Sequence, residues 1–132
     1  MSHVHPTAIV HERAVLGEGV HVGPYCVIGE HVRIGAHSVL HAHVCVSGDT
    51  HLGEHNVVHP FAVIGGLPQR RPESEHVKGL RIGHHNVIRE SVTIHVGTVR
   101  DTSIGDHVLL MAGAHVAHDV SVGSHVTMAN GV

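Results

Sequence analysis

Aliphatic side chains recur every six residues along most of the chain. The first run places Val, Ile or Leu at eleven consecutive positions of this spacing: Val4, Val10, Leu16, Val22, Ile28, Ile34, Leu40, Val46, Leu52, Val58 and Ile64. The spacing returns at Ile82, Ile88 and Ile94, and again at Ile104, Leu110, Val116, Val122 and Met128. A period of six fits neither an α-helix nor a coiled-coil heptad. It is typical of a short strand followed by a turn, repeated many times.

The positions between these aliphatic residues support the same interpretation. Glycine often follows the aliphatic residue, as at Gly17 and Gly53, and glycine permits the positive φ of a tight corner. Four places after each aliphatic residue stands a small or medium side chain: Ala8, Ala14, Val20, Cys26, Val32, Ser38, Val44, Thr50, Asn56 and Ala62. If both sets point inward, three hexads make one triangular coil that pairs with the next.

We therefore predict one all-β domain over residues 1–132, a parallel β-helix of about six coils. Known hexapeptide prisms wind left-handed, against the usual right-handed crossover rule, and we expect that sense here. A β-sandwich fits poorly, because its strands alternate with period two and its turn spacing varies.

Two interruptions of the repeat predict projecting loops at 66–81 and 97–103. In the first, the hexad positions would be Arg70 and His76, which a dry core does not accept. Loops on a rigid scaffold commonly carry binding groups. The repeat continues to Val132 without a capping element, so we expect this chain to be part of a longer protein.

Composition excludes several function classes. Aromatic residues make up only 2% of the chain, and with a formal net charge of −3 there is neither a stacking surface nor a basic field for nucleic acid. Cys26 and Cys45 form no paired zinc motif, which favours a reduced, cytoplasmic protein. No secretory leader is visible, and no apolar stretch approaches the ~20 residues that cross a bilayer.

Histidine is unusually abundant, with 19 residues. Seven of them stand three places after a core aliphatic residue, where a corner would point them outward: His31, His37, His43, His55, His85, His107 and His125. The favoured interpretation is a solvated surface column. A metal-binding or pH-sensing column is a weaker alternative, because the sequence fixes no acidic partner.

His115 and His118 depart from this phase. His115 immediately precedes the core residue Val116, and His118 follows it by two places. Both can therefore line a groove on the surface of the prism. A neutral imidazole there is suited to take a proton from a sugar hydroxyl, although two further surface histidines would explain the spacing equally well.

Three segments together resemble the acyl-ACP–UDP-N-acetylglucosamine O-acyltransferases, which begin lipid A synthesis. They are Ile88-Arg89-Glu90-Ser91-Val92-Thr93-Ile94-His95, Ala114-His115-Val116-Ala117-His118-Asp119 and His5-Pro6-Thr7-Ala8-Ile9-Val10. The resemblance covers essentially the whole chain but only about the first half of a typical family member. It implies a cytoplasmic homotrimeric enzyme with no cofactor and no catalytic metal.

By this resemblance, His118 is the general base. It would deprotonate the sugar 3-hydroxyl, which then attacks the (3-hydroxy)acyl thioester on acyl carrier protein. Gln69, His95 and His115 match positions that contact the nucleotide sugar or the acyl donor. Asp119 is a candidate for tuning His118, although neighbouring strand residues usually face opposite ways.

The chain also departs from the family pattern. Gln69 is followed by Arg70, Arg71 and Pro72 where the family has Asp-Leu-Lys, and Val96 replaces a common arginine. The family's oxyanion glycine, uridine contacts, acyl-length ruler and C-terminal helices would lie beyond Val132. Because one oxyanion donor contributes a factor of ~10²–10³ in rate, we expect this chain alone to be weakly active or inactive.

Three other functions remain open at this point. A γ-type carbonic anhydrase shares the fold, but it needs three histidine zinc ligands with an HxxxxH-type pair, whereas His115 and His118 form HxxH. Another hexapeptide transferase would use acyl-CoA or acetyl-CoA as donor. A non-catalytic β-helix scaffold would use its histidine-rich faces for assembly.

Overall fold

The computed structural model describes residues 1–70 and 76–132, and this part of the chain consists of short strands and turns without a helix. The strands are β1 His3–Val4, β2 Ile9–Val10, β3 Val15–Leu16, β4 His21–Val22, β5 Val27–Ile28, β6 Arg33–Ile34, β7 Val39–Leu40, β8 Cys45–Val46, β9 Thr50–Leu52, β10 Val57–Val58, β11 Val63–Gly66, β12 Leu80–Ile82, β13 Val87–Ile88, β14 Thr93–His95, β15 Thr102–Ile104, β16 Leu109–Leu110, β17 His115–Val116, β18 Ser121–Val122 and β19 Thr127–Met128.

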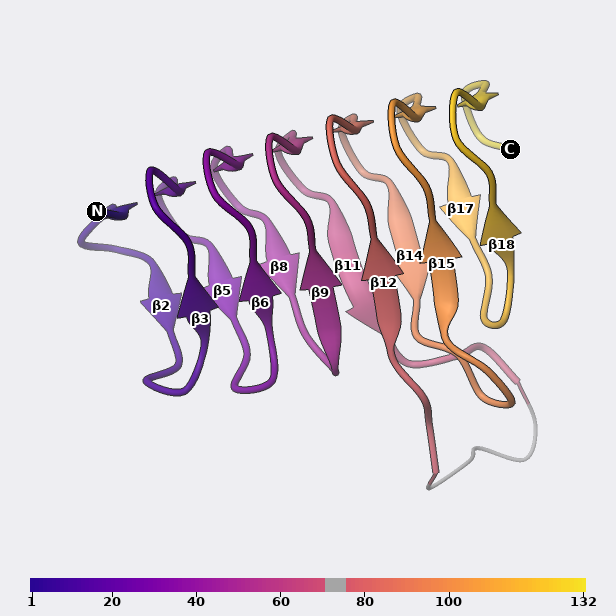
Figure 1. Cartoon of the computed structure of the whole chain (residues 1–132), viewed down its shortest axis with the longest axis horizontal. Coiled ribbons are helices and arrows are strands. Elements are labelled where there is room, and N and C mark those ends of the chain that lie inside the picture. The colour runs from indigo at the N-terminus through magenta and orange to yellow at the C-terminus, as the bar shows by residue number, and fades with distance from the viewer. Residues whose placement is uncertain (71–75) are drawn as a thin grey trace.

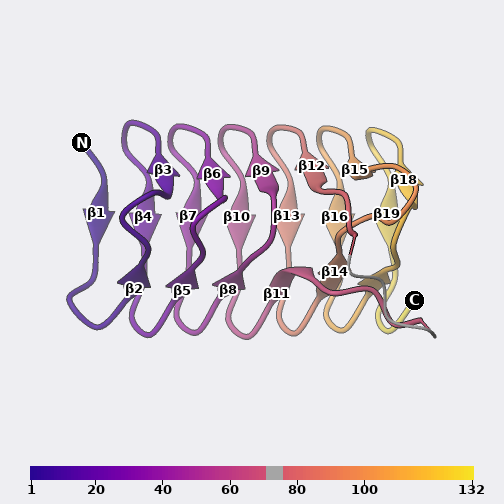
Figure 2. The same cartoon turned by 90° about the horizontal axis from the view of Figure 1, so that it is seen from below.

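Every third strand joins the same sheet, and all strand pairs are parallel (Figures 1 and 2). Sheet A contains β1-β4-β7-β10-β13-β16-β19, sheet B contains β2-β5-β8-β11-β14-β17, and sheet C contains β3-β6-β9-β12-β15-β18. The chain therefore winds A, B, C around one axis. The predicted all-β class and the parallel β-helix are confirmed.

The core consists of the residues that the period of six selects. From Val22 to Val116 the aliphatic hexad positions are buried, and Ile64, Ile88, Ile94 and Leu110 are fully inaccessible. Val4 is 42% exposed and Leu16 only partly buried, because the first coil has a neighbour on one side only. Burial of this aliphatic surface is the main force that stabilises the prism.

Three polar residues of the core, Ser38, Asn56 and Asn86, are paired with one another and with the backbone. The Ser38 hydroxyl and the Asn56 and Asn86 side-chain oxygens each accept the backbone N–H of a residue in the next coil, at 3.1, 3.0 and 2.8 Å respectively. The Asn56 and Asn86 amides donate to the carbonyls of Gly83 and Gly105. Satisfied in this way, buried asparagines tie consecutive coils together without a desolvation penalty.

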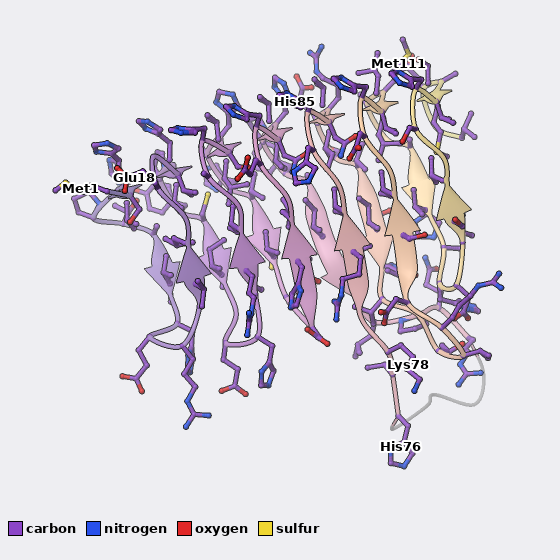
Figure 3. The ribbon with its side chains drawn as sticks, in the orientation of Figure 1. Met1, Glu18, His76, Lys78, His85 and Met111 are labelled. Carbon is purple, nitrogen blue, oxygen red and sulfur yellow. The ribbon has the colours of Figure 1, made fainter. Side chains whose placement is uncertain are left out.

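The prism has three edges, named here by the sheets that their turns connect. Both interruptions of the repeat leave the B–C edge, and Figure 3 shows Lys78 and His76 at the foot of the longer one. Strand pairing extends β11 to Gly66 and starts β12 at Leu80, so Gly66, Leu80 and Arg81 of the predicted loop 66–81 belong to strands. The shorter projecting segment ends at Thr102, which pairs with Leu80 of the preceding coil. Residues 71–75, which include the departures Arg71 and Pro72, lie outside the described part.

The described residues contain no helix of the length and apolar character that would cross a membrane. Cys26 and Cys45 are both free thiols, on the inner and outer side of sheet B respectively.

Candidate active site

His118 and Asp119 form a hydrogen-bonded pair in the turn between β17 and β18, on the B–C edge. His118 Nδ1 lies 2.7 Å from Asp119 Oδ2, and the two side chains are 32% and 18% exposed. Since an ionised carboxylate can only accept, the hydrogen lies on Nδ1 of the imidazole. The second ring nitrogen, Nε2, is then left with a lone pair to accept a proton.

The backbone of Asp119 explains how neighbouring side chains can meet. Asp119 has a φ of +66°, in the left-handed region, so the alternation of an extended strand does not apply to it. Aspartate is among the residues that tolerate this conformation best. The rule that neighbouring strand residues face opposite ways does not apply to His118 and Asp119, because Asp119 lies in a turn.

Asp119 also organises the turn that follows β14. Its Oδ1 accepts the backbone N–H groups of Thr98, Val99 and Arg100 at 2.8, 2.9 and 3.0 Å, and its Oδ2 accepts the Thr98 hydroxyl. The Arg100 guanidinium donates to the Asp119 carbonyl at 2.9 Å. One carboxylate thus connects the histidine to a turn some twenty residues earlier in the sequence.

These hydrogen bonds keep Asp119 ionised. Burial opposes its ionisation, but the hydrogen bonds from Arg100, His118 and Thr98 outweigh that effect and hold the pKa of Asp119 far below its ordinary value. An ionised carboxylate beside an imidazole stabilises the imidazolium that forms when the ring accepts a proton.

Two further histidines lie beside this pair on sheet B. His115 Nδ1 is 2.7 Å from the Thr93 hydroxyl, its register partner in β14. The His95 ring contacts the His115 ring edge to face, with centroids 4.6 Å apart. His95 is only 9% exposed, and its Nδ1 is buried without a hydrogen-bond partner among residues 1–70 and 76–132.

His95 is held in its neutral form. Burial, followed by the neighbouring His115 and His118, lowers the pKa of His95 below its ordinary value. A backbone glycine, Gly66, covers one side of the ring, and a Cβ at that position would come 3.4 Å from His95 Cδ2. A neutral ring with an unsatisfied buried nitrogen is a position where a bound molecule would gain a hydrogen bond.

The structure thus brings together four of the five residues that sequence reasoning selected: His95, His115, His118 and Asp119. Gln69 is exposed in the projecting segment, and no contact between it and these histidines is present in the described part of the chain. Thr93, Thr98 and Arg100 were missed. Only Thr93 carried a signal, since it precedes a core position in the coil that pairs with His115.

Comparison with known proteins agrees with this picture. The model of the bacterial transferase hexapeptide family (six repeats) matches residues 13–48 and 101–132, together just over half of the chain. The chain belongs to the bacterial transferase hexapeptide family.

Within that family the chain resembles acyltransferases of one kind. It is 45% identical over 127 residues to the acyl-[acyl-carrier-protein]–UDP-N-acetylglucosamine O-acyltransferase of Bartonella bacilliformis, covering 94% of this chain and 46% of that protein. The structure of UDP-N-acetylglucosamine O-acyltransferase (LpxA) from Moraxella catarrhalis matches with 45% identity and a TM-score of 0.88, over 91% of this chain and 48% of that one. LpxA from Acinetobacter baumannii matches with 43% identity and a TM-score of 0.94, over 97% and 51%.

These matches confirm the predicted resemblance and the left-handed sense of the β-helix, which the solved relatives share. The chain spans about half the length of the relatives that it matches.

Proposed function

We propose that this chain carries the base of an O-acyltransferase that moves a (3-hydroxy)acyl group from acyl carrier protein to the 3-hydroxyl of UDP-N-acetylglucosamine, the first step of lipid A synthesis. The observation that carries the proposal is the His118–Asp119 pair, with Nδ1 occupied and Nε2 available. The relatives act on the same two substrates by name, and their similarity extends over nearly the whole chain. A cytoplasmic location accords with a cytoplasmic acyl carrier protein.

The proposed reaction needs only one proton acceptor from this chain. Nε2 of His118 takes the proton from the sugar hydroxyl as its oxygen attacks the thioester carbonyl. Asp119 stabilises the resulting imidazolium through the hydrogen bond to Nδ1. When the tetrahedral intermediate collapses, the carbon–sulfur bond breaks and the imidazolium returns its proton to the leaving thiolate.

The other two histidines are proposed to bind substrate. His115 is fixed by Thr93, and His95 is neutral, largely buried and short of one hydrogen-bond partner. Donor and acceptor groups held in this way can orient a polar substrate relative to Nε2 of His118, and orientation is a large part of the rate that enzymes supply. Gln69 is proposed as a further contact, reached from the projecting segment.

We further propose that the protein works as a homotrimer with its grooves between subunits. Sheet B presents exposed aliphatic side chains, with Ile9 68%, Val27 45% and Val63 38% exposed. The adjoining A–B edge carries exposed Tyr25 and Phe61, stacked on His43 between them. An apolar strip of this kind favours association. His115 belongs to the same sheet, so a second subunit packed against sheet B would form one side of the candidate active site.

The relatives found by sequence and by structure are named acyltransferases, which disfavours a γ-type carbonic anhydrase and a non-catalytic scaffold. The remaining alternative, a hexapeptide transferase that uses acyl-CoA, differs from the proposed enzyme in its acyl donor. Acyl carrier protein and coenzyme A carrying the same acyl chain should therefore be compared as donors in one assay.

The direct test is single-turnover acyl transfer with the chain in excess, followed by mass spectrometry of the sugar nucleotide. Because general-base catalysis contributes ~10²–10⁴ in rate, His118→Ala should lower the rate by about that factor. His31→Ala is the matched control, since His31 is another exposed histidine of the B–C edge and should leave the rate unchanged. Equal rates for wild type and His118→Ala, measured on the same slow transfer, would contradict the proposal.

A further inference from the structure

Five imidazoles form a column along the C–A edge, away from the B–C edge that carries the candidate active site. His37, His55, His85, His107 and His125 stack in order, with ring centroids 5.1, 4.9, 5.0 and 5.2 Å apart. The last four rings are parallel to within 5°. Figure 3 shows His85 on this edge, pointing away from the prism. The other two histidines predicted at corners lie elsewhere, His43 on the A–B edge and His31 on the B–C edge.

The backbone beneath the column is held at fixed spacing. All five histidines have φ between 54° and 63°, and the N–H of each donates to a carbonyl of the preceding coil. Directly inside this edge, Ser38, Asn56 and Asn86 form the buried polar ladder of the core. The Cβ atoms of the column are therefore set by the sheet spacing of about 4.8 Å rather than by contacts between rings.

The imidazoles themselves are exposed and unoccupied by other groups. All five residues are exposed, and within residues 1–70 and 76–132 no hydrogen bond or ion pair engages their ring nitrogens. This distinguishes them from His84, His115 and His118, whose Nδ1 atoms are engaged. Glu54 and Asp106 directly precede His55 and His107, and so add negative charge along the edge.

Metal chemistry limits what such a column can hold. Neutral imidazole is a preferred ligand of Zn²⁺, Cu²⁺ and Ni²⁺. With metal–nitrogen bonds of about 2.0–2.1 Å, two nitrogens on one ion lie at most about 4 Å apart. Because imidazole binds through a lone pair in the ring plane, two consecutive rings must rotate out of the stack until their nitrogens lie roughly 3.3 Å apart around a tetrahedral ion, and exposed side chains are free to do so. Rings two coils apart are separated by about 10 Å and cannot share an ion.

We propose that the C–A edge binds divalent transition-metal ions, each held between two consecutive imidazoles of the column, with water completing the coordination. In the described part of the chain no three donor side chains already surround one point, so the sites are two-histidine sites of modest affinity. Five rings accommodate two ions at once. The inference is independent of the acyl-transfer proposal, because it uses none of the active-site residues.

Two double variants test adjacency while keeping the number of histidines equal. His55→Asn with His107→Asn leaves three rings that are each two coils apart. His37→Asn with His125→Asn leaves three consecutive rings. Asparagine is chosen because it tolerates the positive φ of these positions. Calorimetric titration of the folded chain with zinc sulfate should show an affinity at least about tenfold weaker for the first variant. The second variant should keep nearly the wild-type affinity but bind one ion in place of two.

A second readout uses the wild-type chain and needs no substitution. Substoichiometric Zn²⁺ should shift the ring nitrogen-15 resonances of the five column histidines before those of His31 or His43. Equal zinc affinity of the two double variants, shifts that spare the column, or no zinc binding by the wild type would each overturn the proposal, and the column would then be a packing feature only.

Discussion

At the residue scale, Asp119 shows how one backbone angle decides the chemistry of a site. Its positive φ lets two neighbouring side chains meet, and its carboxylate accepts hydrogen bonds from the turn at 98–100 as well as from His118. The same contacts that keep it ionised also determine which nitrogen of His118 carries the hydrogen. Positioning and activation of the base therefore come from a single residue.

Replacing Asp119 with asparagine should disturb both functions. The amide oxygen can still accept from the backbone, but the NH₂ group favours the His118 tautomer with hydrogen on Nε2, which cannot accept a proton. We expect acyl transfer to fall by about 10²–10⁴, by analogy with the loss of the correct tautomer in a catalytic triad. Chemical denaturation at neutral pH should show a loss of about 1–3 kcal/mol for the broken charged hydrogen bonds.

The pH dependence of that stability difference follows from the direction of the Asp119 pKa. Because folding lowers this pKa below its ordinary value of 3.8, the stabilisation is fully present above pH 3.8 and is lost as pH falls towards the folded-state pKa. The difference in unfolding free energy between wild type and Asp119→Asn should therefore shrink below about pH 4. A difference that stays constant down to pH 3 would show that the charge of Asp119 contributes nothing.

At the element scale, the turn at 97–101 belongs to the shorter projecting segment and is hydrogen-bonded to the base of the longer one. Gly97 donates its N–H to Gly79 O and accepts from Lys78 N, at the base of the longer segment. Gly79 N in turn donates to Asp101 at 2.8 Å. Through Asp119, the same turn is connected to His118. The candidate site is therefore a set of turns on one edge that are hydrogen-bonded to one another.

A side chain at Gly97 should break this arrangement. A Cβ there would clash with the carbonyl oxygen of Arg100, whereas a Cβ at Gly123 would meet no described atom within 4 Å. Gly97→Ala should cost about 2–4 kcal/mol in thermal or chemical unfolding and also lower acyl transfer, while Gly123→Ala should change the stability by less than about 0.5 kcal/mol. Similar effects of the two substitutions would contradict the role given to this turn.

The elements of the fold could be predicted from the sequence, but the details of the edge could not. The period of six fixes which residues face inward, and burial of Ile64, Ile94 and Val116 agrees with it. Asp119 and Thr98 are 21 residues apart and follow no repeat, so no local pattern links them. The six-residue period predicted which histidines lie at corners. Which of the three edges each histidine occupies depends on how the hexads close into coils, and only the structure shows this.

At the scale of the whole molecule, the three faces differ in character. The outward positions of sheet B include Ile9, Val27 and Val63, whereas those of sheet C include Arg33, His51 and Arg81. Of these, Arg81 forms an ion pair with Asp49. Charged faces remain solvated at little cost, while an exposed aliphatic strip gains free energy when another surface covers it. Sheet A also has outward aliphatic residues, but they are only half-buried: Val39, Val57, Val87 and Leu109. The more exposed aliphatic residues of sheet B favour it as the face for association.

Light scattering should therefore give a mass of three times 14.0 kDa at micromolar concentration. Val27→Asp, on sheet B, should shift the population to monomer. Val15→Asp is the control, because Val15 is 52% exposed on the outer side of sheet C and its substitution should leave the trimer intact. A wild-type monomer, or equal effects of the two substitutions, would contradict the proposed assembly.

The central claim is that the B–C edge holds His118 as a neutral base whose Nδ1–H is bonded to Asp119. Nitrogen-15 NMR of the histidine rings measures this directly at a pH where His118 is neutral. The account predicts that His118 carries its hydrogen on Nδ1 in the wild-type chain and on Nε2 in Asp119→Asn. A His118 ring with its hydrogen on Nε2 in the wild type, or a tautomer that does not respond to Asp119→Asn, would contradict it.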